Sequence, residues 1–405
     1  MISEDEARTQ IVHAVRTLPS RRITLSQALD CFAAQDYFAR LPLPGFNNSA
    51  MDGYAVVASS CKRDGRLRVI GDQPAGPDRK LRVSGGEAVR IFTGAPLPEG
   101  ADAIVMQEDV TRHGTDISVN VDVEAGEFIR RRGCDLTEGQ LILARGERIR
   151  AATLPLLASQ GLANVNVGGQ PTAAVISTGD ELMKSGEKLQ PGQIYDSNSV
   201  LLNALLQRCR VSETAVEHSP DDRQSLNDAI KRGMKNHVLI VSGGVSVGEH
   251  DLVKESLREL GAKIEIWRVA VKPGKPFLFG WFESETVDSK GQMPGLHQCF
   301  VFGLPGNPVS AFVTFLQFVR PAILRMMGAT NHDLRQVRAK LAVGLTNDSD
   351  RPHYIRGRLE RGKFMPTGRQ ESHALFGLSQ ANGFVRVVAG QSLKAEELVD
   401  VQIWE

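Results

Sequence analysis

The chain has 405 residues, more than one hydrophobic core usually supports, so two to four domains are expected. It carries 48 Lys and Arg against 47 Asp and Glu, a formal net charge of +1. No whole-chain field therefore draws it to nucleic acid or to an anionic membrane, and a small or locally recognised ligand is favoured. The five cysteines have no C-x-x-C spacing, which argues against a disulfide framework or a structural zinc site and suits a reducing cytoplasm.

The N-terminal segment "MISEDEARTQ" lacks a basic stretch followed by an apolar run, so no secretory signal is predicted. The most apolar stretch, residues 309–319, is too short to span a bilayer and predicts a buried helix. These features together favour a cytoplasmic location, with neither a membrane nor a nucleic acid as partner.

The first third of the chain changes texture twice. Apolar residues at helical spacing predict a helix over 4–18, and Thr24 with Gln27 predicts a capping box that opens a second helix over 24–35. Residues 39–59 are dense in Pro, Gly, Asn and Ser, which indicates a long loop. From about 66 to 150, short alternating runs between Gly and Pro turns predict a β-rich insertion.

Helices and strands alternate in the second half. A helix at 151–160 and a strand at 161–169 lead into a series of strands and helices that predicts βαβ units on a parallel sheet. From about residue 330 the pattern returns to short strands. The predicted fold is thus α/β plus β and multi-domain. The series runs through strand 173–177, helix 197–209, strand 211–216, a helix after 222, strand 238–242, a helix after Asp251 and strand 263–267.

Two loops follow strands of the predicted parallel sheet and carry the main candidate residues. In "SGGVSVGEHD", Gly243 and Gly244 would let a phosphate approach the backbone, Ser242 would add a donor, and Asp251 could hold Mg²⁺; a plain turn and a helix cap are the alternative. "STGDEL" has the same form and ends on Asp180 and Glu181. Because ligands bind at the carboxyl ends of parallel strands, the two loops could face one phosphate-bearing ligand.

Other segments add charge and rigidity. "VKPGKPFLFG" places Lys272 and Lys275 on a Pro-Gly turn, which suits a polyanion, although exposed lysines are usually just solvated. "GLPGNPVSA" places Pro305 and Pro308 at the start of the apolar helix. In "IYDSN", an ordinary Ser or Asn helix N-cap is the favoured interpretation. The sequence has no G-x-x-x-x-G-K-[ST], H-E-x-x-H or plausible G-x-S-x-G elbow, so P-loop, zincin and α/β-hydrolase chemistry lose support.

Eight segments occur in the order and with about the spacing of one known family. The chain resembles the molybdopterin molybdenumtransferases of the MoeA type, whose animal relative is the C-terminal part of gephyrin, from about residue 4 to the C-terminus. The segments are "NNSAMDGYA", "IFTGAPLPEGADAIVM", "RRRGCDL", "STGDEL", "IYDSN", "SGGVSVGEHD", "VKPGKPFLFG" and "GLPGNPVSA".

The resemblance implies a four-domain homodimer whose active cleft is shared with the β-rich insertion of the partner subunit. The implied reaction inserts molybdenum from molybdate into adenylylated molybdopterin, with Mg²⁺-assisted release of AMP. Transient contacts with a molybdopterin adenylyltransferase and with acceptor molybdoenzymes would follow. The implied domains are a molybdopterin-binding α/β domain (1–20 and 170–326), a linking or dimerisation domain (21–40 and 140–169), a β-rich insertion (41–139) and a C-terminal β domain (327–405).

The resemblance also implies roles for individual residues. The implied catalytic acids are Asp52, Asp135, Glu181 and Asp251, the last two also binding metal. The implied substrate-binding residues are Thr93, Ser242, Gly243, Gly244, Asp222, Lys272, Lys275, Pro305, Pro308, Arg356 and Ser379.

Several alternatives stay open at this stage. Asp221 or Asp222 could be the matching acid, and a charged first turn of a helix explains either equally well. Ser372 competes with Ser379, and residues 281–300 are expected to form a surface loop. A catalytically silent pterin carrier or scaffold and a molybdopterin adenylyltransferase are the competing functions, and molybdate is not separated from tungstate.

Overall fold

The computed structural model describes residues 1–244, 252–287 and 294–404. The chain forms two compact units and passes between them four times. The first unit comprises Met1–Gln35, Arg145–Ala151 and Asn164–Glu405, and the second comprises Asp36–Ala144 and Ala152–Ala163.

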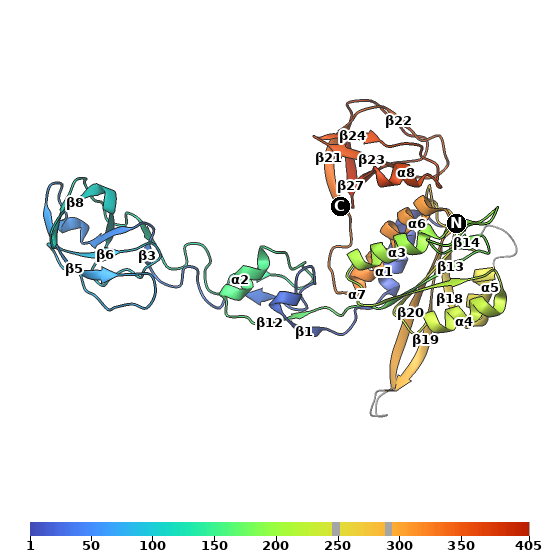
Figure 1. Cartoon of the computed structure of the whole chain (residues 1–405), viewed down its shortest axis with the longest axis horizontal. Coiled ribbons are helices and arrows are strands. Elements are labelled where there is room, and N and C mark those ends of the chain that lie inside the picture. Colours follow the sequence, from blue (N-terminus) through green and yellow to red (C-terminus); the bar gives the residue numbers. More distant parts are fainter. Residues whose placement is uncertain (245–251, 288–293, 405) are drawn as a thin grey trace. The chain divides into compact units, whose positions relative to one another are not determined.

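A six-stranded sheet with the order β16-β13-β17-β20-β19-β18 is the centre of the first unit (Figure 1). Four neighbouring strands, β16, β13, β17 and β20, run parallel, whereas β19 and β18 pair antiparallel. The prediction of a parallel sheet is therefore correct for four strands and wrong for the edge. The strands are β13 (Ala173–Thr178), β16 (Thr214–Ser219), β17 (Val238–Ser242), β18 (Lys263–Trp267), β19 (Leu278–Val287) and β20 (Pro294–Leu304).

Most of the segment expected as a surface loop at 281–300 belongs to this sheet. β19 and β20 pair from Leu278 opposite Gly303 to Val287 opposite Pro294. The polar residues between Trp281 and Phe300 suggested a loop, but they continue the pleat of two strongly apolar strand ends. The loop prediction is wrong for the described part of this hairpin.

Helices cover both faces of the sheet because its central strands are apolar on both sides. On β13, Ala173 and Val175 join one core cluster, while Ala174 and Ile176 join the other. This double burial is typical of parallel strands. The first cluster includes residues of α1 (Glu4–Ala14), α3 (Ser197–Arg208), α6 (Pro308–Thr314) and α7 (Arg320–Met326), and the second includes residues of α4 (Arg223–Gly233) and α5 (Leu252–Glu259).

The predicted buried helix continues further than its apolar stretch. Helix α6, a π-helical segment η4 (Phe315–Val319) and α7 follow one another from Pro308 to Met326. This helix of 19 residues is long and apolar enough to cross a membrane. However, 89% of its apolar stretch is buried inside the protein. Such burial is typical of a core helix.

A closed five-stranded barrel with the order β21-β24-β23-β25-β27 forms the C-terminal part. Its strands enclose a core that includes Leu341, Phe364 and Val401. Helix α8 (Leu375–Ser379) packs against β23. The barrel strands are β21 (Arg335–Leu341), β23 (His353–Glu360), β24 (Lys363–Pro366), β25 (Gly383–Val387) and β27 (Leu398–Ile403), with β22 (Leu345–Thr346) and β26 (Ser392–Leu393) as a side pair.

Short pairs complete the first unit, and one prediction fails there. Strand β1 (Arg21–Thr24) pairs with β12 (Asn164–Val167), and β14 (Leu182–Met183) pairs with β15 (Ile194–Tyr195). The expected second helix is only a 3₁₀ turn, η1 (Leu25–Gln27), and Thr24 makes no side-chain cap to a backbone N–H. Thr24 Oγ1 instead bonds Gln27 Oε1 at 3.2 Å, so the capping-box spacing closes a tight turn.

The second unit is β-rich, as predicted. Its main sheet has the order β7-β4-β6-β5-β9-β8, with separate apolar clusters that include alternate residues of β4. Strands β3 and β4 lie within the predicted loop of residues 39–59. The elements are β2 (Tyr37–Phe38), β3 (Asn48–Ser49), β4 (Gly53–Val56), η2 (Ala58–Ser60), β5 (Arg66–Gln73), β6 (Glu87–Ile91), β7 (Ala103–Met106), η3 (Gln107–Asp109), β8 (Val110–His113), β9 (Asp116–Val119), β10 (Ile129–Arg130), β11 (Leu141–Leu143) and α2 (Thr153–Ser159).

Candidate functional site

A cavity of about 760 Å³ lies where the parallel strands end. Ser177, Ser242 and Leu304 occupy one register across β13, β17 and β20, so these carboxyl ends meet at one edge of the sheet. Ligands of open α/β sheets bind at this edge. We call this cavity the strand-end cavity. It is lined by Ser177, Thr178, Gly179, Glu181, Leu182, Ile194, Tyr195, Asp196, Ser197, Asn198, Asp221, Ser242, Gly243, Gly244, Gly306, Asn307, Pro308, His373 and Leu375.

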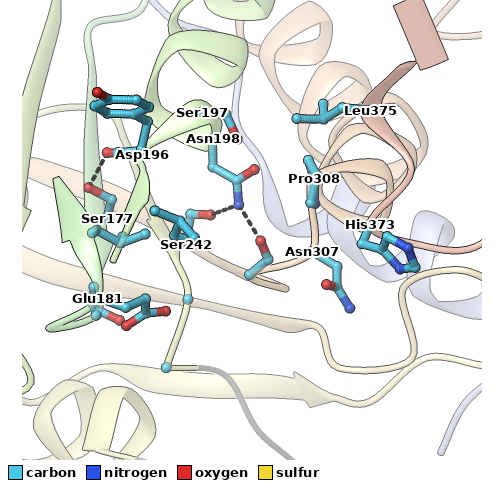
Figure 2. Close-up of a pocket in the computed structure, with 18 of the residues that line it drawn as sticks. Ser177, Glu181, Asp196, Ser197, Asn198, Ser242, Asn307, Pro308, His373 and Leu375 are labelled. Carbon is cyan, nitrogen blue, oxygen red and sulfur yellow. Dashed lines mark hydrogen bonds between the residues drawn. The ribbon is translucent and has the colours of Figure 1, made fainter. Parts of the chain in front are cut away.

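A polar network ties three loops together beneath this cavity (Figure 2). Asn198 donates from Nδ2 to Ser242 Oγ at 3.0 Å and to the carbonyl of Gly306 at 2.7 Å. Its Oδ1 is buried and has no hydrogen-bond partner among the described residues. Since a buried polar atom without a partner is costly, Asn198 is a candidate for ligand contact.

The N-cap of α3 is Asp196 and not the Ser or Asn that the sequence favoured. Its Oδ1 accepts the backbone N–H of Ser199 at 3.0 Å, which caps α3. Its Oδ2 accepts the hydroxyl of Ser177 at 2.6 Å, so the cap also fixes the end of β13.

The two glycines after β17 are required by close packing of loops. Gly243 and Gly244 have φ values of +94° and +63°. A Cβ on Gly243 would lie 2.5 Å from the carbonyl oxygen of Thr178, and one on Gly244 would lie 2.7 Å from Cγ2 of Val253. The turn interpretation therefore holds for both, and the same geometry leaves their backbone on the cavity wall.

Acidic side chains gather on one side of the strand-end cavity. Burial raises the pKa of Asp221, and the neighbouring carboxylates of Asp180 and Glu181 raise it further. The backbone N–H of Asp221 donates to Asp180 Oδ1 at 3.1 Å. These three acids are the described groups that would attract a cation.

Asp221 and Asp222, the two acids between which the sequence left a choice, occupy different positions. Asp221 lines the cavity, whereas Asp222 is the N-cap of α4 and accepts the N–H of Ser225 at 2.8 Å. Hydrogen bonds from Ser225 lower the pKa of Asp222. Asp222 therefore does not line the strand-end cavity.

A buried cationic group lies beside the loop that carries His373. Lys272 pairs through its backbone with His353 on β23, and burial with the nearby charges of Lys272 and Arg356 lowers the pKa of His353 to about 4. Arg356 is 0% exposed. It donates to the carbonyls of Arg369 and Glu371, which leaves its Nε and Nη1 without hydrogen-bond partners among the described residues.

The two candidate serines of the C-terminal part, Ser372 and Ser379, occupy different positions. The carbonyl of Ser372 accepts the N–H of Val309 at 3.0 Å, next to cavity residues Pro308 and His373. Ser379, the one the sequence favoured, ends α8 and donates its hydroxyl to the carbonyl of Phe376. Neither serine lines the cavity, although Ser372 directly precedes the lining residue His373.

Three consecutive stretches of the chain match known domain families. Residues 2–161 match the MoeA N-terminal region (domain I and II), residues 174–325 a probable molybdopterin binding domain, and residues 338–404 the MoeA C-terminal region (domain IV). The molybdopterin molybdenumtransferase of Haemophilus influenzae is 35% identical over 417 residues, covering 98% of each chain.

The chain belongs to the molybdopterin molybdenumtransferase family. A relative of that name from Nostoc is 32% identical, over 95% of this chain and 87% of its own. Two crystal structures of molybdopterin biosynthesis MoeA proteins from Pyrococcus horikoshii give TM-scores of 0.78 and 0.77, at 30% and 25% identity, over 100% of this chain and 99% and 100% of theirs. The resemblance read from the eight segments is confirmed.

Other residues that the family resemblance singled out lie apart from the strand-end cavity lining. Lys275 and Pro305 are not among the lining residues, while Pro308 is, as the first residue of α6. The carbonyl of Lys275 accepts the N–H of Val269. Asp251 lies outside the described residues.

The second unit carries two of the implied catalytic acids, Asp52 and Asp135. Asp52 Oδ1 accepts both the N–H and the hydroxyl of Thr93, each at 2.7 Å. These two hydrogen bonds, and more weakly the charge of Arg90, lower the pKa of Asp52. Asp135 is exposed, and its backbone N–H donates to Leu43. Asp52 and Thr93 thus form one paired feature of this molybdopterin molybdenumtransferase family member.

Sequence reasoning missed most of the apolar and aromatic wall. Ile194, Tyr195 and Leu375 line the cavity and keep 54%, 43% and 40% of their surface exposed. Exposed Ile and Tyr beside "DSN" were a signal that could have been used. The contribution of His373 and Leu375 depends on how the barrel packs, which no local pattern reports.

Proposed function

We propose that this chain is a molybdopterin molybdenumtransferase, which inserts molybdenum from molybdate into adenylylated molybdopterin and releases AMP. The observation that carries the proposal is the strand-end cavity at the carboxyl ends of parallel strands, in a chain whose curated relatives of that name match it over 98% of its length. One wall is polar and glycine-rich, one is acidic and one is apolar, which suits a ligand with a pyrophosphate and flat rings.

The polar wall would bind the phosphate-bearing part of the substrate. Ser242 and Asn198 are already joined by a hydrogen bond, so the wall is preorganised. The glycine backbone at 243–244 permits close approach of an anion. The exposed faces of Ile194, Tyr195 and Leu375 would take the flat rings.

The cationic group would receive an oxyanion. Arg356 retains two buried donors without partners, and Lys272 lies next to it through His353. Buried donors of this kind favour the charge of molybdate or of a leaving phosphate. Arg356 would act from below the loop at 369–371, since its side chain does not line the cavity.

Hard oxygen ligands fit Mg²⁺, which usually takes one or two carboxylates and completes its shell with water and substrate phosphates. Among the described residues no group of three or more His, Cys, Asp or Glu is arranged to hold a metal. Glu181 and Asp221 would hold Mg²⁺, together with Asp251, because the third described acid of the lining, Asp196, is engaged by Ser177 and Ser199. When bound, the ion would offset the charge of the pyrophosphate during its cleavage.

The proposal includes a homodimer in the cytoplasm, the four-domain division given above, and transient delivery by a molybdopterin adenylyltransferase. It also keeps Asp52, Thr93 and Asp135 as active-site groups. The hydrogen bonds that lower the pKa of Asp52 support an ionised carboxylate, which a charged substrate or metal would require.

The test combines purified protein, adenylylated molybdopterin, Mg²⁺ and molybdate, and follows AMP release and reactivation of a cofactor-free molybdoenzyme. Both signals should depend on molybdate. Glu181→Gln should lower AMP release at saturating substrate by about tenfold or more, because an amide is a weaker ligand for a hard cation. Pterin binding should stay within about twofold.

Glu187→Gln is the matched control, since Glu187 lies on the same loop but does not line the strand-end cavity. Its AMP release should equal that of the parent. Tight pterin binding with neither product would instead assign the chain to the carrier class, and product formation at the parent rate by Glu181→Gln would remove Glu181 from the mechanism.

A further inference from the structure

A second cavity, of about 360 Å³, lies at the opposite end of the helices that line the strand-end cavity. Helix α3 begins at the first cavity with Ser197 and Asn198 and ends at the second with Arg208. We call this second cavity the arginine-lined cavity. Its lining residues are Arg148, Leu205, Arg208, Cys209, Phe312, Phe315, Leu316, Arg320, Leu334, Arg335, Ile403 and Trp404.

The charge around this cavity is unbalanced. Four arginines line it, and none of its described lining residues is acidic. Arg148 pairs with Asp30 at 3.5 Å, and no salt bridge within the described ranges involves the other three. Four guanidinium groups less one carboxylate leave a formal excess of three positive charges.

Two of these arginines are fixed in place by backbone carbonyls. Arg208 donates to Trp404 at 2.8 Å, and Arg320 Nη1 donates to His332 at 2.9 Å. Carbonyl partners orient a guanidinium without neutralising it. Burial lowers the pKa of Arg320, and the like charges of Arg148 and Arg8 lower it further, whereas Cys209 and Asp333 act in the opposite direction.

The remaining lining is apolar and partly aromatic. The ring of Trp404 lies 5.1 Å from that of Phe312, centroid to centroid, and is thereby held in an edge-on arrangement. Leu205, Leu316 and Ile403 complete this side. The cavity thus offers guanidinium groups and an apolar wall within one small volume, which suits a ligand that is charged at one end.

The local backbone gives an independent indication of function. Phe315 and Leu316 belong to the π-helical segment η4, which interrupts the long core helix. Such π-helical turns are rare and occur mostly at functional sites. The interruption lies at the arginine-lined cavity. It does not lie at the strand-end cavity, which is at the beginning of the same helix.

We propose that the arginine-lined cavity binds a small organic anion in which a phosphate group is attached to a flat apolar ring. The arginines would hold the phosphate, since guanidinium forks match its geometry. The aromatic and aliphatic wall would take the ring. This site is separate from the proposed reaction and does not depend on it.

The test uses phenyl phosphate as the probe and fluorine NMR of protein labelled with 5-fluorotryptophan. The chain has three tryptophans, and Trp404 is the one in the cavity, so Trp404→Phe assigns its signal. Phenyl phosphate should shift the Trp404 signal saturably and leave Trp267 and Trp281 unchanged. It should bind about tenfold more tightly than inorganic phosphate, because the ring adds apolar contact.

Arg335→Gln should weaken phenyl phosphate binding about fivefold by removing one exposed cation from the site. Arg338→Gln is the matched control, because Arg338 lies on the same strand but pairs with Asp400 at 3.6 Å. Arg208→Gln provides a second variant on a different element. If neither Arg335→Gln nor Arg208→Gln weakens binding, the proposal is wrong.

Two further outcomes would also overturn it. Equal affinity for phenyl phosphate and inorganic phosphate would indicate only a charged patch. Glu405 lies outside the described residues and follows Trp404 directly, so Glu405→Gln must be compared. If phenyl phosphate moves the Trp404 signal only in Glu405→Gln, the arginines serve that side-chain carboxylate.

Discussion

His353 shows how one side chain can report on the charge around it. It is 8% exposed, and its pKa is lowered to about 4 by burial first and then by Lys272 and Arg356. Above pH 6.5 the ring is neutral in both folded and unfolded chains. Between pH 6.5 and 4 the unfolded chain binds a proton that the folded chain does not, so stability is lost as the pH falls.

We expect this group alone to cost about 2 kcal/mol of unfolding free energy at pH 5 relative to pH 8. Urea unfolding of the parent and of His353→Gln measures it, and the ring proton signal of His353 should stay in its neutral position down to about pH 4. His113→Gln, at an exposed position, is the control. A constant difference between parent and His353→Gln from pH 8 to 5 would contradict the assignment.

At this scale the sequence predicted residue types better than contacts. Ser242, Gly243, Gly244 and Glu181 line the strand-end cavity because a loop after a parallel strand is placed by the strand itself. Arg356 was expected to bind substrate, but it is buried beneath another loop. No local pattern reports how far a side chain is covered by a segment distant in sequence.

At the scale of elements, two adjacent acids provide a clean comparison. Asp222 caps α4, so Asp222→Ala should lower stability by about 1 kcal/mol and leave AMP release unchanged. Asp221→Asn should do the opposite, with lower AMP release and slightly higher stability at neutral pH. Because the pKa of Asp221 is raised in the folded chain, its ionised carboxylate lowers the free energy of unfolding above that pKa. Near pH 3.8 this destabilisation disappears.

Thermal unfolding at pH 7 and at pH 4, with AMP release at pH 7, separates the two variants. The stability gain of Asp221→Asn should shrink toward pH 4, in line with the sign of the shift. Loss of AMP release in Asp222→Ala with an intact melting temperature would show that Asp222 contacts substrate after all.

Element types were predicted well where a pattern repeats, and poorly where pairing decides. The alternation of strands and helices after residue 173 is confirmed, because each strand carries its own apolar signal. The β19–β20 hairpin was missed, since its polar outer half gains structure only by pairing across two strands. The spacing of Thr24 and Gln27 suggested a helix. The residues that follow do not form one, because they pair with β12 and with residues near 148.

At the scale of the whole molecule, the ends of the chain meet in the first unit. Glu4, at the start of α1, accepts a hydrogen bond from Tyr354 and an ion pair from Arg386 at 3.0 Å, both in the C-terminal barrel. Glu4 is 6% exposed, so its charge needs these partners. Pairings between residues more than 300 positions apart leave no local trace, and they are what sequence reasoning could not supply.

The proposed homodimer makes a prediction that only whole subunits can test. Asp52 belongs to the second unit and Glu181 to the first. If each active site takes these residues from different subunits, a dimer of one Asp52→Ala and one Glu181→Gln subunit has one intact site and one doubly altered site. Random mixing makes half of the dimers mixed, each with one working site of two, so about a quarter of parental AMP release should return.

Each variant alone should release AMP at no more than about a tenth of the parental rate, and the mixture must be unfolded and refolded together so that subunits exchange. Native mass spectrometry of subunits with different tags would verify that mixed dimers have formed. Full exchange without recovered activity would show that both residues serve sites within a single subunit. A monomer at working concentration would remove the shared site altogether, since no partner could then supply Asp52.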